Sequence, residues 1–441
     1  MRTDKCFPEW LLVFILVFIC LFSNYSLADR AIPTGSVIFI HPDGVGAATW
    51  GAMRIFFYGP DSLSNWDRLE RMGLYRSHVL DATNSSSHCG GTIHGFGVKA
   101  NFDTFGNTPE KPVRSLSEKD YSILVEAQKA GMATVLINSG HICEPGSAAF
   151  VANSAKRSDT DNISAQVVNS GVDVILSGGE ILLLPEGVIG FHGQPGVRKD
   201  GRNLIDEAMA NGYQVVYTRD QLAALPDDVD KVFGVFASYH TFYDLPEEEL
   251  AAKNLPLFNP QAPTVAEMET AALRILNNKH KQFIMVIEQE GTDNFANCNN
   301  AIGTLTALKQ ADDAIGIAVE YSKSHPDLLI ITASDSEAGG MQVCSVKNPD
   351  KHLPPTSNNG APIDGISGTN STPFIAAPDR NGVRLPFGIT WAGADDYAGG
   401  VIARAQGLNS NMLQNNVDNT DIYRIMYATL FGKILPPYTG K

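Results

Sequence analysis

Residues 36–46 read SVIFIHPDGVG, an apolar run that stops at Asp43 and continues into a glycine turn. The run predicts a buried strand with Asp43 at its carboxyl end. Ligands of open α/β sheets bind at that edge, so a carboxylate there is a candidate cation ligand. The alternative is that the aspartate caps the helix after the turn, and this segment alone does not separate the two interpretations.

The rest of the chain alternates short apolar runs with longer segments of helical periodicity, which predicts an α/β fold. Most runs are rich in Val, Ile and Leu on both faces, as expected for a central, mostly parallel sheet covered by helices on both faces. We expect strands at Ser36–His41, Ala133–Ile137, Val172–Leu176, Tyr213–Tyr217, Val232–Ala237, Phe283–Ile287 and Leu328–Ile331. The clearest helices are expected at Ser117–Ala130, Val265–Asn277 and Ala301–Ser324.

Two further expected strands also end in acidic and polar residues. Glu288 follows one of them, and Asp293 and Asn297 lie beyond it, four residues apart and so on one face of a helical turn. Asp335 and Ser336 follow the other strand. Alone, Asp293 is better interpreted as a helix cap. Carboxylates gathered at one sheet edge repel each other unless cations neutralise them, so the recurrence predicts a polynuclear metal centre.

A candidate nucleophile lies in residues 84–97, NSSSHCGGTIHGFG, where hydroxyl groups lead into a helix of small residues. The helix dipole activates a serine at such an N-terminus, and a bound metal turns it into an alkoxide. A serine that only caps the helix is the alternative.

The 441 residues carry a formal net charge of −15, which argues against non-specific binding to nucleic acid. At the N-terminus, Arg2 and Lys5 precede an uncharged run at 10–22 and small residues at 26 and 28. This pattern predicts a signal peptide over residues 1–28, and its apolar run is too short to span a membrane. We therefore expect an exported protein without a membrane span after cleavage, periplasmic in a Gram-negative bacterium and otherwise secreted.

The expected mature chain, residues 29–441, is interpreted as a single catalytic domain. Two stretches, 182–202 and 347–370, are expected to be surface insertions; the second is rich in Pro, Gly and Asn, which resists helix or strand.

Taken together, these motifs resemble the alkaline phosphatase family over nearly the whole mature chain. In that family an Asp-Gly-x-Gly follows the first strand, as residues 43–46 do here, and its aspartate bridges metals. The nucleophilic serine stands ten residues before the glycine of a Gly-Val-Lys, which is 97–99 in this chain and points to Ser87. The Glu-x4-Asp pattern of the family matches Glu288 and Asp293.

The resemblance also implies a phosphate-binding arginine, which is Arg157, at the matching distance from Glu144. A planar guanidinium suits two phosphate oxygens. Residues 177–180, 198–202 and 263–268 are similar to family sequences as well.

The departures from the family pattern concern the metal ligands. Typical members have histidines at three metal positions, where this chain has Asn297, Ser336 and Asp396. The implied ligand set is all oxygen, which favours Mg²⁺, Ca²⁺ or Mn²⁺ over Zn²⁺. The threonine usual at the magnesium position is Gly146 here, so a third cation is expected on Glu288 with Glu144 or Ser147.

Histidines and cysteines near the motifs leave zinc possible. His88, His94 and His141 either supply a nitrogen ligand or support and pack around the site. Cys89, Cys143 and Cys298 are either ligands or, as we favour, disulfide or core residues.

The resemblance implies a metal-dependent phosphomonoesterase that acts on a small-molecule phosphomonoester through a phosphoserine intermediate on Ser87, with Arg157 holding phosphate. Two or three divalent cations are expected, with ligands among Asp43, Ser87, Glu144, Ser147, Glu288, Asp293, Asn297, Asp335, Ser336 and Asp396. Alternatives are a phosphodiesterase or sulfatase of the same superfamily and a non-catalytic relative that binds phosphate or cations. Family members are commonly homodimers, so a homodimer is also expected.

Overall fold

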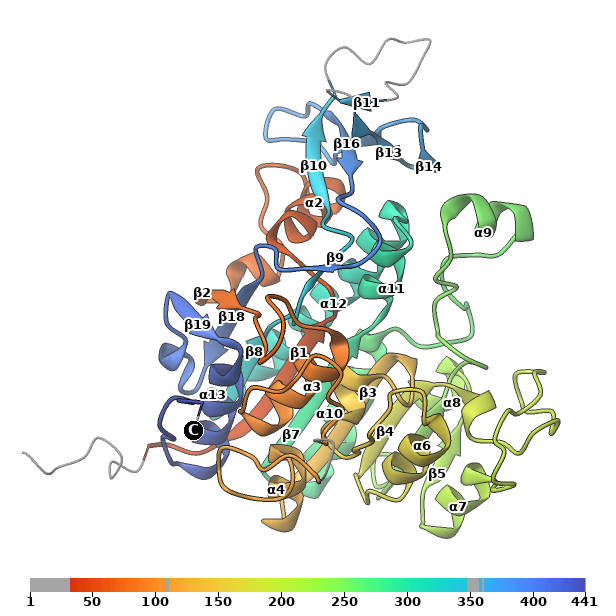
Figure 1. Ribbon diagram of the computed structural model, residues 1–441, viewed down its shortest axis with the longest axis vertical. Coiled ribbons are helices and arrows are strands. Elements are labelled where there is room, and N and C mark those ends of the chain that lie inside the picture. The colour runs from red at the N-terminus through yellow and green to blue at the C-terminus, as the bar shows by residue number, and fades with distance from the viewer. Residues whose placement is uncertain (1–31, 108–110, 347–356, 359–360, 441) are drawn as a thin grey trace, which may run out of the picture.

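A computed structural model describes residues 32–107, 111–346, 357–358 and 361–440. Its centre is a ten-stranded sheet that crosses Figure 1 from β19 and β2 on the left to β5 on the right. In spatial order the strands are β19 (Asn416–Asp418), β2 (Arg71–Arg76), β18 (Ile402–Gly407), β8 (Leu328–Thr332), β1 (Ser36–Pro42), β7 (Phe283–Gln289), β3 (Ala133–His141), β4 (Val174–Gly178), β6 (Val232–Val235) and β5 (Gln214–Val216).

All strands from β8 to β5 run parallel, whereas β18 is antiparallel to both of its neighbours. The α/β fold with a mostly parallel sheet is therefore confirmed. Each of the seven strands expected from sequence is present, although β3 runs on beyond Ile137 and β4 begins at Val174.

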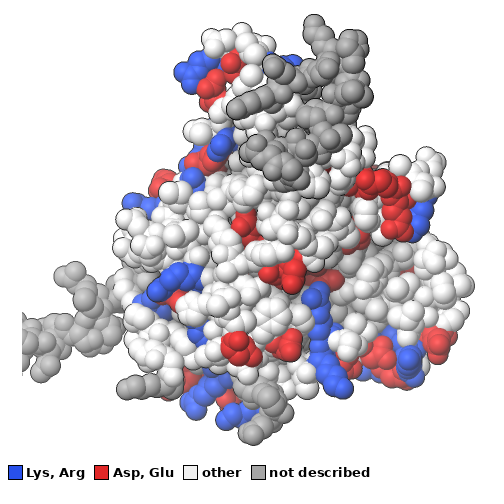
Figure 2. Space-filling model, turned by 45° about the horizontal axis from the view of Figure 1, so that its top comes forward, with Lys and Arg blue, Asp and Glu red and all other residues white. Residues whose placement is uncertain are grey.

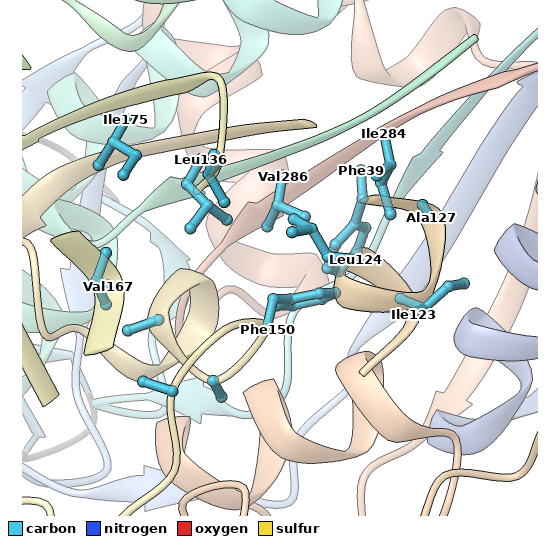
Figure 3. Packing of buried hydrophobic residues seen from close by; sticks show 14 of the residues in the cluster. Phe39, Ile123, Leu124, Ala127, Leu136, Phe150, Val167, Ile175, Ile284 and Val286 are labelled. Carbon is cyan, nitrogen blue, oxygen red and sulfur yellow. The ribbon is translucent and has the colours of Figure 1, made fainter. Parts of the chain in front are cut away.

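Helices cover both faces of the sheet, and β1 shows why its sequence is apolar throughout. Its side chains alternate between two cores, with Val37 and Phe39 in one and Ile38 and Ile40 in the other. The first core, shown in Figure 3, is closed by α4 (Ile123–Lys129), α5 (Pro145–Ala148), α6 (Thr160–Val168), α7 (Leu204–Ala210) and α13 (Asn419–Phe431). The second is closed by α2 (Ala47–Phe57), α8 (Arg219–Ala223), α10 (Val265–Lys279) and α12 (Ala301–Ser322).

Helices α10 and α12 confirm two of the three expected helices, but the expected start of the third at Ser117 is wrong. Glu118 has a positive φ of 65°, which no α-helix accommodates. Ser122 then accepts a hydrogen bond from the Val125 backbone N–H and so caps α4, which begins at Ile123.

A smaller sheet stands above the carboxyl edge of the central one in Figure 1. It contains β10 (Gln342–Ser345), β13 (Asp364–Gly365), β14 (Gly368–Thr369), β15 (Phe374–Ile375) and β16 (Pro386–Thr390). Two short pairs accompany it: β9 (Glu337–Ala338) with β17 (Asp396–Tyr397), and β11 (Ser357–Asn358) with β12 (Ala361–Pro362). The remaining α-helices of the described part are α3 (Ser87–Phe96), α9 (Glu247–Lys253) and α11 (Gly291–Asn297).

Of the two expected insertions, residues 182–202 form a loop with isolated bridges that is tied to the fold by the buried Arg198 side chain. Residues 347–356 and 359–360 of the other, and the expected signal peptide at 1–28, lie outside the described residues. The domain boundaries stay a prediction. In the described part, every helix is too short or too polar to cross a membrane.

Candidate active site

Acidic side chains converge where β1, β7 and β8 end. Asp43 follows β1, Asp293 lies in α11 just after β7, and Asp335 follows β8. All are buried, with exposed fractions of 0%, 7% and 0%. Parallel strands present their carboxyl ends at one edge, and the three segments meet there as the sequence predicted. Figure 2 shows acidic side chains gathered near the middle of one face, with basic side chains beside them.

Two groups of potential ligand atoms share Asp43. One contains His41, Asp43 and Asp335, and the other Asp43, Glu288 and Glu290; within each group the atoms lie within 4.8 Å of one another. Such spacing suits oxygen and nitrogen ligands around a common cation, whose bonds are about 2.0–2.6 Å long.

Several oxygens of this cluster have no hydrogen-bond partner in the protein, which tests whether the residues fit cations. Buried polar groups are normally hydrogen-bonded, and one left unpaired is costly. Here buried oxygens without a hydrogen-bond partner include both carboxylate oxygens of Asp43 and Glu290, Oδ1 of Asp293 and Asn297, and Oδ2 of Asp335. Unpaired carboxylate and amide oxygens of this kind fit hard divalent cations, and one unpaired nitrogen, His41 Nε2, lies among them.

The same crowding shifts the pKa values of the carboxyl groups. Burial, followed by repulsion from Asp43, raises the pKa of Glu288 to about 7 and that of Asp396 to about 6. Burial and neighbouring acids also raise the pKa values of Asp293 and Asp335. Without cations the cluster therefore retains protons that bound cations would displace.

Asp43 is the exception, because burial raises its pKa but the adjacent His41 lowers it further, with help from Asp335 and Ser87. His41 Nε2 lies 3.4 Å from Asp43 Oδ1, and its Nδ1 lies 2.8 Å from the Ala333 carbonyl oxygen. Asp43 is thus the carboxylate held ionised at the centre of the group.

Asp396 reaches the cluster through β17, which pairs with β9 two residues after Asp335. The Asn297 amide Nδ2 donates to Asp293 Oδ2 at 3.0 Å and lies 3.5 Å from Asp396 Oδ1. These three residues, all expected to be metal ligands, therefore lie together. Ser336 is fully buried beside Asp335 and donates to its Oδ1 at 3.4 Å.

Ser87 is the first residue of α3 and is 4% exposed. The preceding Ser86, not Ser87, occupies the capping position, and its hydroxyl donates to the Phe102 carbonyl at 2.8 Å. The simple cap interpretation therefore applies to Ser86. Ser87 therefore does not cap the helix. It lies at the helix N-terminus beside Asp43, whose pKa it lowers.

Glu144 gathers three cationic or N–H donors around one carboxylate. Arg157 Nη2 donates to its Oε2 at 2.9 Å, while Nε2 of His141 and His240 lie 2.9 and 3.1 Å from its Oε1. His240 Nδ1 in turn lies 2.7 Å from Asp244 Oδ2. Burial opposes protonation of His240, but these two carboxylates raise its pKa to about 9. The ion pair with Glu144 therefore fixes the position of the Arg157 guanidinium.

Arg157 faces the acidic cluster from its rim. Burial lowers its pKa, but Glu144, Glu290 and Asp293 raise it further, so the charge is retained. Its side chain is 41% exposed and donates to Glu144 through Nη2. A guanidinium carries five N–H donors, so others stay available to a ligand.

The usual threonine position has no room for a side chain. The Gly146 N–H donates to Glu288 Oε1 at 2.9 Å, and a Cβ at residue 146 would lie 2.3 Å from that oxygen. Ser147 is adjacent, but its hydroxyl accepts from the Asn138 amide at 2.8 Å, and Asn138 also donates to Glu288. The roles of Glu144 and Ser147 as metal ligands stay predictions.

The histidines and cysteines that the sequence offered as alternative ligands make packing contacts and hydrogen bonds inside the protein. His94 is fully buried, with Nε2 2.8 Å from the Tyr75 hydroxyl and its ring against Phe39. Burial lowers the pKa of His88 to about 4, and its Nδ1 lies 3.1 Å from Ser86 Oγ. Cys89, Cys143 and Cys298 form no disulfide, in contrast to one of the roles considered from sequence.

Sequence reasoning missed His41, Glu290 and His240. His41 lies two residues before Asp43, and this spacing along a strand places both on one face. Glu290 follows β7 directly, and His240 lies in the segment after β6. All three therefore lie at or after the carboxyl end of a strand, as do the acids that were predicted from sequence.

Comparisons with known proteins identify the family of this chain. The family model described as alkaline phosphatase matches residues 35–362. An alkaline phosphatase of Escherichia fergusonii is 23% identical and the alignment covers 92% of this chain and 87% of that protein. The membrane-bound alkaline phosphatase of Bombyx mori is 25% identical, with 79% of this chain and 68% of that protein covered.

A solved structure with the same fold is a histidine-to-aspartate variant of the alkaline phosphatase from the Antarctic bacterium TAB5, which holds Mg. It has a TM-score of 0.68 and 20% identity, and covers 90% of this chain and 99% of its own. The fold is therefore alkaline-phosphatase-like. With most of its length matched by the family model, the chain belongs to the alkaline phosphatase family.

Proposed function

We propose that the protein hydrolyses phosphate monoesters with bound divalent cations, through a phosphoserine intermediate on Ser87. The observation that carries this proposal is the set of buried carboxylate oxygens without partners beside a serine at a helix N-terminus. Family membership adds support, since the curated relatives are alkaline phosphatases.

Two cations are proposed to lie among Asp43, Ser87, Asp293, Asn297, Asp335, Ser336 and Asp396. The donors are oxygens, which suit Mg²⁺, Ca²⁺ or Mn²⁺ better than Zn²⁺. A TAB5 variant with an aspartate in place of a histidine holds Mg in its M3 site, which supports a hard cation in a protein of this fold. When bound, the cations neutralise phosphoryl charge and lower the pKa of the serine hydroxyl.

Ser87 and Arg157 are proposed to carry out the remaining steps of the reaction. The Ser87 oxygen attacks phosphorus in line; the new Ser87 O–P bond forms as the ester O–P bond breaks and the alcohol departs. Arg157 donates to the non-transferred phosphoryl oxygens, whose charge is dispersed in the transition state. Water then cleaves the phosphoserine and releases inorganic phosphate, which regenerates the Ser87 hydroxyl.

The substrate class is tested with p-nitrophenyl phosphate, bis(p-nitrophenyl) phosphate and p-nitrophenyl sulfate, which share one leaving group. We expect kcat/KM for the monoester to exceed the other two by at least about 10²-fold, since Arg157 and the cations suit a dianion. Inactivation by a chelator is the matched control. Preference for the diester or the sulfate would favour the alternative activities, and phosphate binding without turnover would favour the non-catalytic relative.

Export and dimerisation complete the proposal. The pattern of residues 1–28 supports export to the periplasm or the medium. Homodimerisation rests on the resemblance to the family.

A further inference from the structure

Glu290 is a buried glutamate that the expected ligand set does not include. It is 1% exposed and both of its carboxylate oxygens lack a hydrogen-bond partner. It stands at the capping position of α11, but its side chain makes no capping hydrogen bond. A role as helix cap is therefore excluded, and the desolvated carboxylate needs another partner.

The fold makes room for this side chain and fixes its backbone. A Cβ at residue 140 would lie 2.7 Å from Glu290 Cγ and 2.8 Å from Glu144 Cγ, so Gly140 lets the two acids lie over it. The Glu290 N–H donates to Ser139 Oγ at 2.9 Å. These contacts hold Glu290 beside the other carboxylates.

The carboxylate of Glu290 approaches two expected ligands. One oxygen each of Asp43, Glu288 and Glu290 lie within 4.8 Å of one another. Oxygens around one Mg²⁺ or Ca²⁺, with bonds of about 2.0–2.6 Å, are separated by comparable distances. The group has three acidic side chains and no cationic partner within it, so a divalent cation is its natural counter-charge.

The two residues that sequence offered for this position have other partners. Glu144 is engaged by Arg157, His141 and His240, and the Ser147 hydroxyl is engaged by Asn138. Of the candidates beside Glu288, Glu290 is the one whose oxygens have no hydrogen bond.

We propose that Glu290 is a metal ligand of this chain, which with Asp43 and Glu288 holds the third cation in place of a threonine ligand. This inference rests on the proposed function for the other two cations. A carboxylate in place of a hydroxyl adds negative charge to the site, which favours a hard cation there.

The test is isothermal titration of chelator-stripped full-length protein with Mg²⁺, comparing wild type, Glu290→Gln and Glu269→Gln. Glu269 is the matched control, because it is also fully buried in α10 without partners for its oxygens, but burial alone raises its pKa. We expect Glu290→Gln to lose one binding event or to weaken it by at least about 10-fold, and Glu269→Gln to keep all of them.

Thermal unfolding provides a second readout that a purely structural role would not produce. In chelator, Glu290→Gln should unfold at a higher temperature than wild type, because it replaces a buried acid without a partner by a neutral amide; saturating Mg²⁺ should reverse that order. A lower unfolding temperature in both conditions, or unchanged Mg²⁺ binding, would overturn the inference.

Turnover of p-nitrophenyl phosphate, measured on the same samples, separates the two proposals. Wild type that binds cations through Glu290 but does not turn over would refute the proposed function and uphold the ligand. Active Glu290→Gln with wild-type Mg²⁺ stoichiometry and affinity would uphold the function and refute the ligand.

Discussion

Replacing Ser87 with alanine is expected to lower kcat for p-nitrophenyl phosphate by about 10³-fold or more, because the nucleophile is lost. The Ser87 side chain is small and stands at the start of α3 without serving as its cap, so folding should be unaffected. The carboxylates that hold the cations remain in place. Isothermal titration should therefore show the same number of bound cations as in wild type.

Ser122→Ala is the matched control for this substitution. Ser122 is also buried and also at a helix start, but it caps α4. The control should lose about 1 kcal/mol of unfolding free energy and keep its turnover. Retained turnover in Ser87→Ala would exclude Ser87 as the nucleophile and direct attention to Ser86 or Ser85. Mass spectrometry of acid-quenched wild type, with the phosphoryl group on the peptide containing residue 87, checks the assignment independently.

Replacing Arg157 with alanine is expected to lower kcat/KM by about 10²–10³-fold, as loss of an oriented donor to a transition-state oxygen does. Arg157→Lys should recover only part of this, since an ammonium cannot form two parallel hydrogen bonds to phosphate. Inorganic phosphate should also inhibit the alanine variant less, because phosphate and the transferring group use the same guanidinium.

The control for Arg157 is Arg114→Ala, which removes an exposed arginine whose ion pair with Glu118 spans 3.9 Å. Exposed ion pairs contribute little, so this variant should match wild type in kcat, KM and phosphate inhibition. Wild-type kcat/KM in Arg157→Ala would show that the guanidinium does not contact the transferring group. Its contact with Glu144 would then be structural.

The central strands were predictable because they are buried on both sides. β1, β7 and β8 read as continuous apolar runs, and such runs are distinctive in a sequence. The antiparallel part was not predicted, because β2 is mostly exposed, with Met72 and Leu74 each 52% accessible, and forms no apolar run. The start of α4 was misplaced because the turn near Glu118 depends on a backbone conformation that side-chain periodicity does not report.

The residues of the candidate site also fall into those that strand patterns predicted and those that they did not. Asp43, Asp293 and Asp335 follow strong strands, so strand ends alone predicted that they would meet. Asp396 belongs to a two-residue strand without a sequence signal of its own, and only the resemblance to the family indicated it. Glu290 was not included among the expected ligands, because the family pattern matches Glu288 instead.

The most direct test is the hydrolysis of p-nitrophenyl phosphate at alkaline pH by chelator-stripped protein, titrated separately with Mg²⁺, Ca²⁺, Mn²⁺ and Zn²⁺. Our account predicts that a hard cation restores turnover, because every proposed ligand is an oxygen. Restoration by Zn²⁺ alone would contradict the oxygen-ligand account and implicate nearby imidazoles such as His41. If none of the four cations restored turnover, the proposed phosphatase activity would be contradicted.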